Sequence, residues 1–316
     1  MHGVYFIIGP TATGKSELAA DVAHKLGAEV VSADAFQIYR GFDLLSAKPD
    51  TTTLARAPHH LIGTMSILEE LNAAKFRRLA LRAIEEICSR DKMAIVVGGS
   101  GLYIKSLTHG LSPAPSADAK LRAELNELNL DDLGKRLVDL DLETARKIDM
   151  KNRRRVVRAL EICLLRGKPA STQRGQAVAR TVGPGQPRSA TAATTGIFIF
   201  RDRAELHQRI NQRVEKMFED GVVDEVRATL ARDTNPVSAT ASQMIGLQEI
   251  QQHLEGKMSI QQCVEKIQQA TRQYAKRQLT WFRHQTNFEP LNLSLLTHKE
   301  AVERISQRAS LVAQKG

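Results

Sequence analysis

The chain has 316 residues and carries 45 Lys and Arg against 35 Asp and Glu, which gives a formal net charge of +10. Hydrophobic residues make up 42% and charged residues 25%, a composition that is typical of a folded globular protein and not of a disordered one. No apolar run approaches the ~18 residues of a membrane span, and three separated cysteines without a C-x-x-C pair disfavour both a disulfide scaffold and a structural zinc site. The short apolar stretch near the N-terminus lacks the basic region of a signal peptide, so we expect a cytoplasmic protein. Its excess positive charge suggests a polyanionic partner.

The first part of the chain, residues 1–112, alternates between strand and helix patterns. Short apolar runs rich in β-branched residues predict buried strands at 4–8, 29–32 and 94–97. Helical spacing of apolar residues predicts helices at 17–26 and 73–89. Such alternation favours an α/β fold in which helices cover a parallel sheet.

The pattern changes after residue 112. Residues 113–170 have helical spacing and dense charge without a strand signal, which predicts a helical insertion domain. Residues 171–195 are rich in Gly, Pro, Ser, Thr and Ala and contain no acidic residue, so we expect a flexible surface loop. A strand-like run at 196–200 begins the return to the core, and the rest of residues 196–316 is predicted to be mostly helical.

The strongest motif is a phosphate-binding loop. It matches G-x-x-x-x-G-K-[ST] between a buried strand and a helix, and its residues are Gly9, Pro10, Thr11, Ala12, Thr13, Gly14, Lys15 and Ser16. In such a loop the backbone N–H groups and the helix N-terminus face phosphate oxygens. Lys15 would contact the terminal phosphate and the Ser16 hydroxyl would bind Mg²⁺. The alternative is a chance Gly-rich turn, but the context favours a P-loop NTPase-like sheet that binds a diphosphate or polyphosphate.

Two further features of the predicted sheet edge narrow the chemistry. Asp34 follows the second strand and should emerge beside the P-loop, where it could hold Mg²⁺ through water, accept a proton or cap the next helix. The strand at 94–97 runs into Gly98-Gly99-Ser100-Gly101, without the acid that P-loop hydrolases place beside Mg²⁺. The machinery for ATP hydrolysis is therefore incomplete, while Ser100 offers a hydroxyl between glycines that permit close approach of a nucleotide.

Two basic segments are candidates for nucleic-acid contact. In the first, Lys151, Arg154, Arg155 and Arg158 share one arc of a predicted helix, opposite apolar residues that dock it. In the second, residues 271–284 contain no acid and interleave basic residues with Tyr274 and Trp281. Arginines without acidic partners favour phosphate contacts, and aromatic rings among them suit RNA. A solvated charged face and rings that pack in the core are the alternatives.

Together these segments resemble the tRNA dimethylallyltransferase family over most of the chain, from the P-loop to about Arg283. Besides the P-loop, the resemblance rests on residues 34–40, 47–49, 59–62, 98–103, 158–161 and 271–283. The chain departs from the family pattern at Ala35, Gly63, Ser100 and Leu247, where Ser, an acid, Thr and Tyr are usual. Lys15, Ser16 and Asp34 are intact, so we expect an active enzyme.

The resemblance implies transfer of a dimethylallyl group from its diphosphate to N6 of adenosine-37, 3′ of the tRNA anticodon, giving N6-(dimethylallyl)adenosine and diphosphate. The P-loop would then hold the leaving diphosphate with Mg²⁺ instead of ATP, helped by Arg209 or Arg213. Asp34 would be the general base. Gln37 and Ser100 would contact the adenine, flipped out of its stack.

The resemblance also implies a surface for the anticodon stem-loop, with the helical insertion as a tRNA-gripping domain. The tRNA-binding residues so implied are Asp34, Ala35, Phe36, Gln37, Ser100, Arg122, Arg154, Arg155, Val156, Val157, Arg158, Lys276, Arg277, Gln278, Trp281 and Arg283. We expect a monomer without membrane association.

Two other functions remain open from the residues alone. A P-loop kinase of a small metabolite would use Asp34 as its base and the insertion as a lid, but it leaves both basic segments unexplained. A non-catalytic RNA-binding protein that uses a nucleotide as a switch would bind RNA without forming a covalent product.

Overall fold

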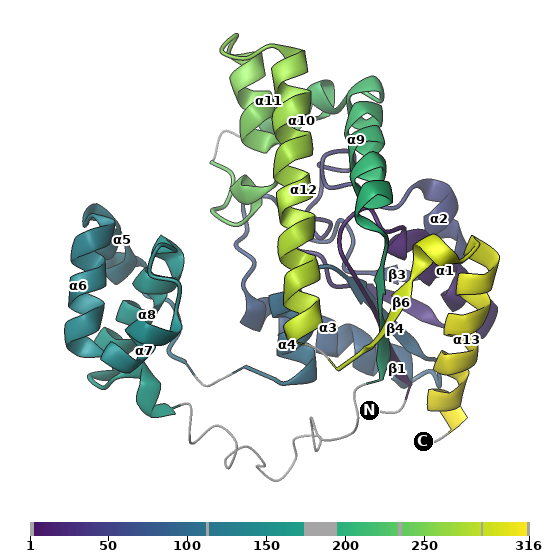
Figure 1. Cartoon of the computed structure of the whole chain (residues 1–316), viewed down its shortest axis with the longest axis horizontal. Helices are drawn as coiled ribbons and strands as arrows, with labels where there is room; N and C mark the ends of the chain where they lie inside the picture. Colours follow the sequence, from purple (N-terminus) through teal and green to yellow (C-terminus); the bar gives the residue numbers. More distant parts are fainter. Residues whose placement is uncertain (1–2, 112–113, 174–194, 233–235, 286, 315–316) are drawn as a thin grey trace. The chain divides into compact units, whose positions relative to one another are not determined.

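The structure is a computed structural model that describes residues 3–111, 114–173, 195–232, 236–285 and 287–314 (Figure 1). The chain divides into two compact units, one formed by Met1–Gly110 with Ser189–Gly316 and the other by Leu111–Arg188. Most of the loop predicted at 171–195 lies outside the described residues. Its first three residues were predicted as flexible loop but belong to a short 3₁₀ helix, η1 (Ala170–Gln173). No helix in the described ranges is both long and apolar enough to cross a membrane.

The first unit is built on a six-stranded parallel sheet. Its strands are β1 (Val4–Ile8), β2 (Glu29–Ser32), β3 (His59–His60), β4 (Ala94–Gly98), β5 (Gly196–Phe200) and β6 (Glu289–Asn292). Their order is β3-β2-β4-β1-β5-β6, and every pairing is parallel. The predicted α/β class and four predicted strands are confirmed. The edge strands β3 and β6 were not predicted, because the first has only two residues and the second contains Pro290, which a strand tolerates at an edge.

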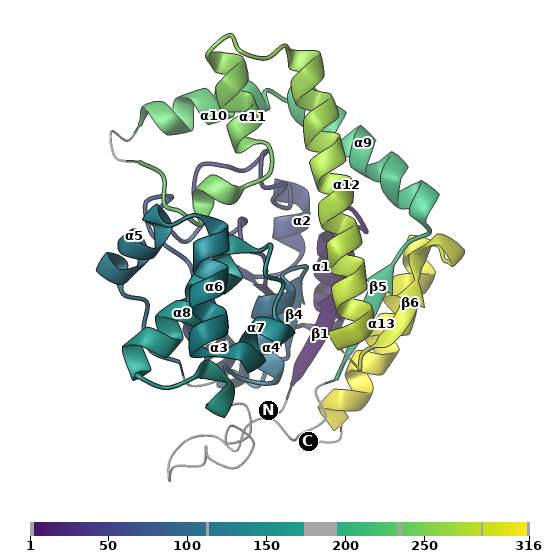
Figure 2. The ribbon, with the colours of Figure 1, turned by 60° about the vertical axis from the view of Figure 1, so that its left-hand side comes forward.

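Helices surround this sheet in the first unit. They are α1 (Lys15–Leu26), α2 (Thr51–Arg56), α3 (Ala73–Cys88), α4 (Gly101–Thr108), α9 (Arg203–Glu219), α10 (Val222–Ala231), α11 (Leu247–Leu254), α12 (Ile260–Gln285) and α13 (His298–Gln314), with 3₁₀ turns at Ala241–Gln243 and Leu293–Leu295. The long helix α12 runs beside α9, as both Figure 1 and Figure 2 show.

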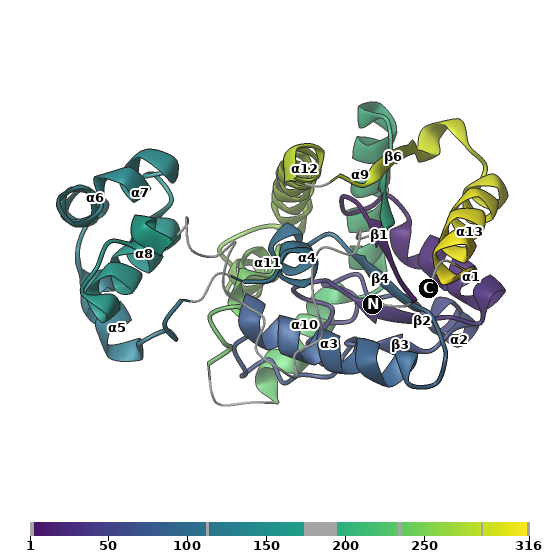
Figure 3. The same ribbon diagram turned by 90° about the horizontal axis from the view of Figure 1, so that it is seen from below.

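The alternation of side chains along the strands creates two cores, one on each face of the sheet. Phe6 and Ile8 of β1 point into the larger core, which also contains residues of α3, α4, α9, α11 and α12. Tyr5 and Ile7 point into the other core, where α1 and α13 cover the sheet (Figure 3). Because both faces are covered, three of the inner strands, β1, β4 and β5, consist of apolar residues and glycine, which is the pattern that made them predictable.

The carboxyl ends of the central strands bring the candidate site residues to one edge of the sheet. β1 continues into the P-loop, β2 is followed by Asp34, and β4 ends at Gly98. Neighbouring backbones approach closely here: a Cβ on Gly98 would lie 2.2 Å from the carbonyl oxygen of Ala33. A larger residue at this position would therefore push the Asp34 turn away from β4.

The second unit is a small helical bundle made of α5 (Ala119–Glu127), α6 (Leu130–Leu140), α7 (Leu142–Lys147) and α8 (Arg153–Arg166). Each helix begins where a side chain caps a backbone N–H of the first turn; the capping residues are Asp118, Asn129, Asp141 and Asn152. Leu133 and Leu137 of α6 pack against Val156 and Leu160 of α8 to form its core.

Candidate active site

The P-loop has the geometry that its sequence predicts. The buried Thr13 hydroxyl donates a hydrogen bond to the carbonyl oxygen of Pro10 at 2.9 Å and closes the loop from inside. Gly14 has a φ of +90° immediately before α1 begins at Lys15, a conformation that glycine adopts without the strain other residues would incur. The free N–H groups of the first turn of α1 therefore end beside the loop, as an anion site requires.

Two arginines of the segment after β5 fix the P-loop from outside. The Nε of Arg209 donates to the carbonyl oxygen of Ala12 at 2.9 Å, and the Nε of Arg201 donates to that of Thr13 at 3.0 Å. Arg209 was predicted as a diphosphate ligand, and it lines the cavity beside the loop; Arg201 was missed. No local pattern marks Arg201, because its partner lies 188 residues away in the chain.

Gln278 of α12 connects the P-loop to the end of β4. Its Oε1 accepts a hydrogen bond from the Thr11 N–H at 2.9 Å, and its Nε2 donates to the carbonyl oxygen of Gly99 at 2.8 Å. The side chain is buried. Gln278 was predicted among the tRNA-binding residues, but both ends of its amide are occupied by backbone, so in this structure it orients two loops of the site.

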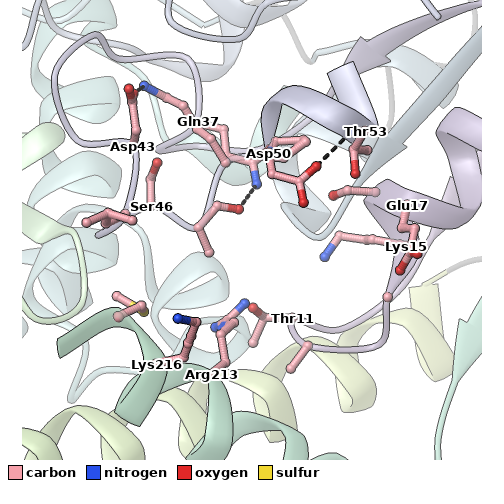
Figure 4. A pocket seen from close by; sticks show the side chains of 18 of the residues that line it. Thr11, Lys15, Glu17, Gln37, Asp43, Ser46, Asp50, Thr53, Arg213 and Lys216 are labelled. Atoms are coloured by element: carbon pink, nitrogen blue, oxygen red, sulfur yellow. Dashed lines mark hydrogen bonds and ion pairs between the residues drawn. The ribbon is translucent and has the colours of Figure 1, made fainter. Parts of the chain in front are cut away.

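A cavity of about 560 Å³ opens in front of the P-loop (Figure 4). Lys15 points into it from the loop, and Thr11 and Arg213 line another part of its wall. Asp34, Gln37 and Ser46 also line it. The cavity therefore brings together cations from α1 and α9 with the carboxylate that follows β2.

Two cations of this cavity, Lys15 and Arg213, are held without an ion pair in the described part of the chain. Burial lowers the pKa of Lys15 to about 8, although the carboxylate of Asp34 opposes the shift. Burial likewise lowers the pKa of Arg213, whose Nε is buried without a hydrogen-bond partner among the described residues. Cations in this state, at a cavity wall and without a counter-charge, favour an anionic ligand, because a phosphate would supply the missing charge and acceptors.

Asp34 both shapes the backbone and faces the cavity. Its Oδ1 accepts hydrogen bonds from the N–H groups of Phe36 at 3.0 Å and Gln37 at 3.4 Å, which makes it the cap of a turn. Its Oδ2 accepts no hydrogen bond from the residues described here. The capping role weighed from sequence is therefore present, and it orients a carboxylate whose second oxygen remains available to a substrate.

The other residues predicted to contact adenine form the walls of the same turn. The Ser100 hydroxyl accepts a hydrogen bond from the Ala35 N–H at 3.1 Å. The Gln37 amide donates to the carbonyl oxygen of Ala47 at 2.9 Å and accepts from the Ser32 hydroxyl at 3.3 Å. Ser100 and Gln37 thus hold the turn around Asp34 between β4 and the segment that precedes α2.

A second, smaller cavity of about 60 Å³ adjoins the first. Eight residues line the second cavity but not the first, and all of them except Thr271 are apolar or aromatic. They are Phe36, Leu45, Val214, Met244, Ile245, Ile267, Thr271 and Tyr274. Asp34, Ser46, Ala47 and Arg213 are among the residues that line both cavities. A cationic cavity beside a small apolar one suits a ligand in which a short hydrocarbon is attached to a phosphate group.

The donor atoms around the large cavity fit a hard divalent cation. The Ser16 hydroxyl and the carboxylates of Asp34 and Asp50 line it, whereas no group of three His, Cys, Asp or Glu side chains capable of holding a metal occurs in the described residues. Mg²⁺ characteristically takes one or two protein oxygens and completes its shell with water and substrate phosphate. The site therefore fits a metal that arrives with its phosphate ligand.

The basic face of α12 is exposed, and its aromatic residues are mostly packed. Lys276, Arg277 and Arg283 are exposed, and the Arg277 guanidinium lies 5.9 Å from the centre of the Tyr274 ring. Trp281 is half-buried, makes an edge contact with Phe282, and lies where a Cβ on Gly101 would be 2.5 Å from its ring. The cations of this segment are therefore available to phosphate.

In the helical unit the predicted cationic ridge is partly neutralised. The carboxylate of Glu161, which is fully buried, forms ion pairs with both Arg122 and Arg158 and accepts the Asp118 N–H at 2.8 Å. Burial would raise the pKa of Glu161, but the hydrogen bonds from Arg158, the Asp118 N–H and Arg122 outweigh it and lower that pKa. The expectation that the ridge lacks acidic partners is wrong at Arg158, because Glu161 lies one helical turn beyond it.

Four neighbouring residues of α8 that were predicted to bind tRNA fall into two groups. Val156 and Val157 are buried in the core of the helical unit, so their side chains pack against α6 and do not present a surface to RNA. Arg154 and Arg155 are exposed. A helix that packs against its unit through one face can contact RNA only through the opposite face. The two valines lie on the packed face.

The parallel sheet, the P-loop and the cationic cavity beside Asp34 define a P-loop enzyme that acts on a phosphate-bearing substrate. The profile of the IPPT family, described as IPP transferase, matches residues 37–285. The chain therefore belongs to the IPP transferase family, which confirms the resemblance identified from its motifs.

Individual relatives agree with this assignment. The chain is 44% identical over 282 residues to the tRNA dimethylallyltransferase of Geobacter sulfurreducens, covering 88% of each chain, and 42% identical over 274 residues to tRNA dimethylallyltransferase 1 of Citrifermentans bemidjiense, covering 87% of each. Among solved structures, the tRNA isopentenylpyrophosphate transferase of Bacillus halodurans aligns with a TM-score of 0.70 at 30% identity, over 100% of this chain and 98% of that one. A eukaryotic dimethylallyltransferase acting on tRNA aligns with a TM-score of 0.76 at 26% identity, over 97% of this chain and 80% of that one.

Proposed function

We propose that this protein transfers a dimethylallyl group from dimethylallyl diphosphate to N6 of adenosine-37 in tRNA. The observation that carries the proposal is the pair of adjoining cavities, one cationic and one apolar, with Asp34 in the wall of both. The diphosphate occupies the first and the five-carbon group extends toward the second. Family membership supports the same activity.

The leaving group is held by the P-loop and the cations that face it. Negative charge develops on the diphosphate as its C–O bond breaks. It is stabilised by Lys15, Arg209 and Arg213 and by the N–H groups at the start of α1. The Ser16 hydroxyl would hold Mg²⁺, which supplies further charge stabilisation when bound. The Lys15 ammonium donates a hydrogen bond to the carbonyl oxygen of Pro10 at 3.3 Å, which holds its charge at the cavity before the reaction begins.

Asp34 acts as the general base. As the N6 nitrogen forms its bond to C1 of the dimethylallyl group, diphosphate departs from C1 and a proton leaves N6 for the Asp34 carboxylate. The hydrogen bonds from the Phe36 and Gln37 N–H groups to Oδ1 orient the carboxylate, and Oδ2 is the oxygen that accepts the proton.

The RNA is bound by exposed cations. Lys276, Arg277 and Arg283 of α12 lie in the same unit as the cavity, and Arg155 supplies a cation on α8 of the helical unit. We further propose that the enzyme uses Mg²⁺, that it is active as a monomer and that it is located in the cytoplasm. A small-metabolite kinase would leave these cations and the apolar cavity without a role.

The test is incubation of the purified protein with unmodified tRNA, Mg²⁺ and dimethylallyl diphosphate, followed by nucleoside mass spectrometry. We expect an adenosine carrying one dimethylallyl group at position 37. Asp34→Asn should reduce its rate of formation by about 10²–10⁴-fold, the usual contribution of a general base, with tRNA affinity unchanged.

Asp220→Asn is the matched control, since Asp220 is an exposed acid that lines the same cavity and pairs with Lys216. It should keep the wild-type rate. A wild-type rate in Asp34→Asn would remove Asp34 from the mechanism. ATP-dependent phosphorylation of a metabolite without a prenylated product would favour the kinase.

A further inference from the structure

Helix α10 contains an acidic residue, Glu225, whose carboxylate accepts hydrogen bonds from the backbone N–H groups of a loop that is distant in the sequence. Its Oε1 accepts hydrogen bonds from the N–H groups of Asp43 at 2.7 Å and Leu44 at 2.8 Å, and its Oε2 accepts from that of Leu45 at 2.9 Å. Three successive N–H groups that converge on one carboxylate form the anion-binding arrangement called a nest. Glu225 forms no ion pair within the described residues, so these N–H groups are its counter-charge.

A second residue of the same helix holds the start of this loop. The Thr229 hydroxyl donates to the carbonyl oxygen of Gly41 at 2.6 Å, one helical turn beyond Glu225. Gly41 has a φ of +89°, and a Cβ there would lie 3.0 Å from the Thr229 methyl group. Residues 41–45 are therefore attached to α10 at both ends.

The attached segment, residues 41–48, forms part of the wall of the active site. Asp43, Leu44 and Lys48 line the larger cavity, Leu45 lines the smaller one, and Ser46 and Ala47 line both. The segment belongs to no helix or strand. Its N–H groups at 46–48 bond back within the segment, to the carbonyl oxygens of Phe42, Leu44 and Asp43, so those bonds do not connect it to the rest of the protein.

Glu225 itself does not line either cavity. Any effect on the reaction must therefore pass through the loop. Without the carboxylate, three N–H groups would lose a charged acceptor. The segment would then depend for its position on the hydrogen bonds from Thr229 and Gln37 and on the packing of Phe42 and Leu45 in the core.

We propose that Glu225 is a positioning residue for prenyl transfer: its carboxylate fixes the loop that lines the two cavities, and so sets the geometry in which the allylic diphosphate is held. This inference rests on the proposed function. It assigns Glu225 to recognition of the diphosphate substrate and not to RNA binding, because the loop faces the cavities.

The experiment compares Glu225→Gln with Asp224→Asn, a neighbouring acid of α10 that is exposed and pairs with Arg227. A glutamine keeps the size of the side chain but offers one neutral acceptor oxygen. We expect Glu225→Gln to raise KM for dimethylallyl diphosphate about tenfold, as expected for the loss of a charge-assisted hydrogen bond, with KM for tRNA unchanged. Asp224→Asn should leave both values unchanged.

Amide hydrogen exchange supplies a second readout that does not depend on catalysis. Residues 43–45 should exchange faster in Glu225→Gln than in the wild type, while the peptides of β1 and β4 keep their protection. If wild-type protein forms no prenylated tRNA, the proposed function fails, yet the exchange result still decides whether Glu225 holds the loop.

A pair of substitutions at Thr229 covers the case in which Glu225→Gln does not fold. Thr229→Val removes the hydrogen bond to Gly41 and should raise KM for the diphosphate, whereas Thr229→Ser keeps the hydroxyl and should not. Unchanged exchange at 43–45 in Glu225→Gln, or a rise confined to KM for tRNA, would overturn the proposal. So would equal behaviour of Thr229→Val and Thr229→Ser.

Discussion

The cavity of the α/β unit and the helical unit both contain arginines that the family resemblance assigned to phosphate contacts, and the two groups differ in their counter-charges. Arg213 lines the same cavity as Lys15 and forms no ion pair within the described residues. Arg122 and Arg158 share the buried carboxylate of Glu161. A cluster of arginines therefore indicates a phosphate site only where no acid from the rest of the fold reaches it.

The substitution with the largest expected effect compares an arginine without an acidic partner with one that has such a partner. Arg213→Gln should lower kcat/KM for dimethylallyl diphosphate by about 10²–10³-fold, as removal of one donor to developing negative charge does in other enzymes. Arg122→Gln, the matched change in the helical unit, should leave that value unchanged. Initial rates at saturating tRNA with varied diphosphate measure both. Equal losses in the two variants would contradict the distinction.

A second substitution removes the acid of the helical unit. Glu161→Gln leaves Arg122 and Arg158 without their partner, and we expect a loss of about 2 kcal/mol in stability of this unit, between the values for exposed and buried pairs. Because the pKa of Glu161 is lowered in the folded protein, this stabilisation is present above the ordinary Glu pKa and is lost as the pH falls through the lowered one. Hydrogen exchange in α5 and α8 at pH 7 and at acidic pH measures it. Protection equal to wild type would show that the ion pairs contribute nothing.

The pH dependence of the reaction tests the role of Lys15, another cavity cation that forms no ion pair within the described residues. Its pKa is lowered to about 8, so the charged ammonium is present below that pH and is lost as the pH rises through it. We expect kcat/KM for the diphosphate to fall above pH 8, approaching about tenfold per pH unit. Lys15→Arg remains charged, so its profile should lack this decline, although its absolute rate will be lower. A decline of the same steepness in both proteins would assign the pKa to another group.

The smallest expected effect concerns RNA and salt. Arg155 is exposed on α8, whereas Arg158 is bound to Glu161. Arg155→Gln should reduce the slope of log binding constant against log salt concentration by about 0.7–0.9 for each RNA phosphate that the variant no longer neutralises. Arg158→Gln should leave the slope unchanged. A reduced slope in Arg158→Gln alone would mean that RNA displaces Glu161 from this arginine.

Local sequence patterns determined the P-loop, the four buried strands and the position of Asp34 at their carboxyl edge. These features depend on residues that are close in the chain: eight consecutive positions from Gly9 to Ser16, and apolar runs such as Val4–Ile8. Their physical requirements, a tight turn that exposes N–H groups and burial of both faces of a strand, are properties of short segments.

Only the tertiary structure decided which polar groups form hydrogen bonds or ion pairs with other parts of the protein. Gln278 reaches Thr11 across 267 residues, and Glu225 reaches Asp43 across 182, so neither pairing leaves a trace in local spacing. The same holds for the availability of each cation: Arg158 is occupied because Glu161 is buried beside it, and Arg213 has no acid within ion-pair distance among the described residues. Residue type fixes the charge of a side chain, but packing of distant segments fixes whether that charge is already neutralised.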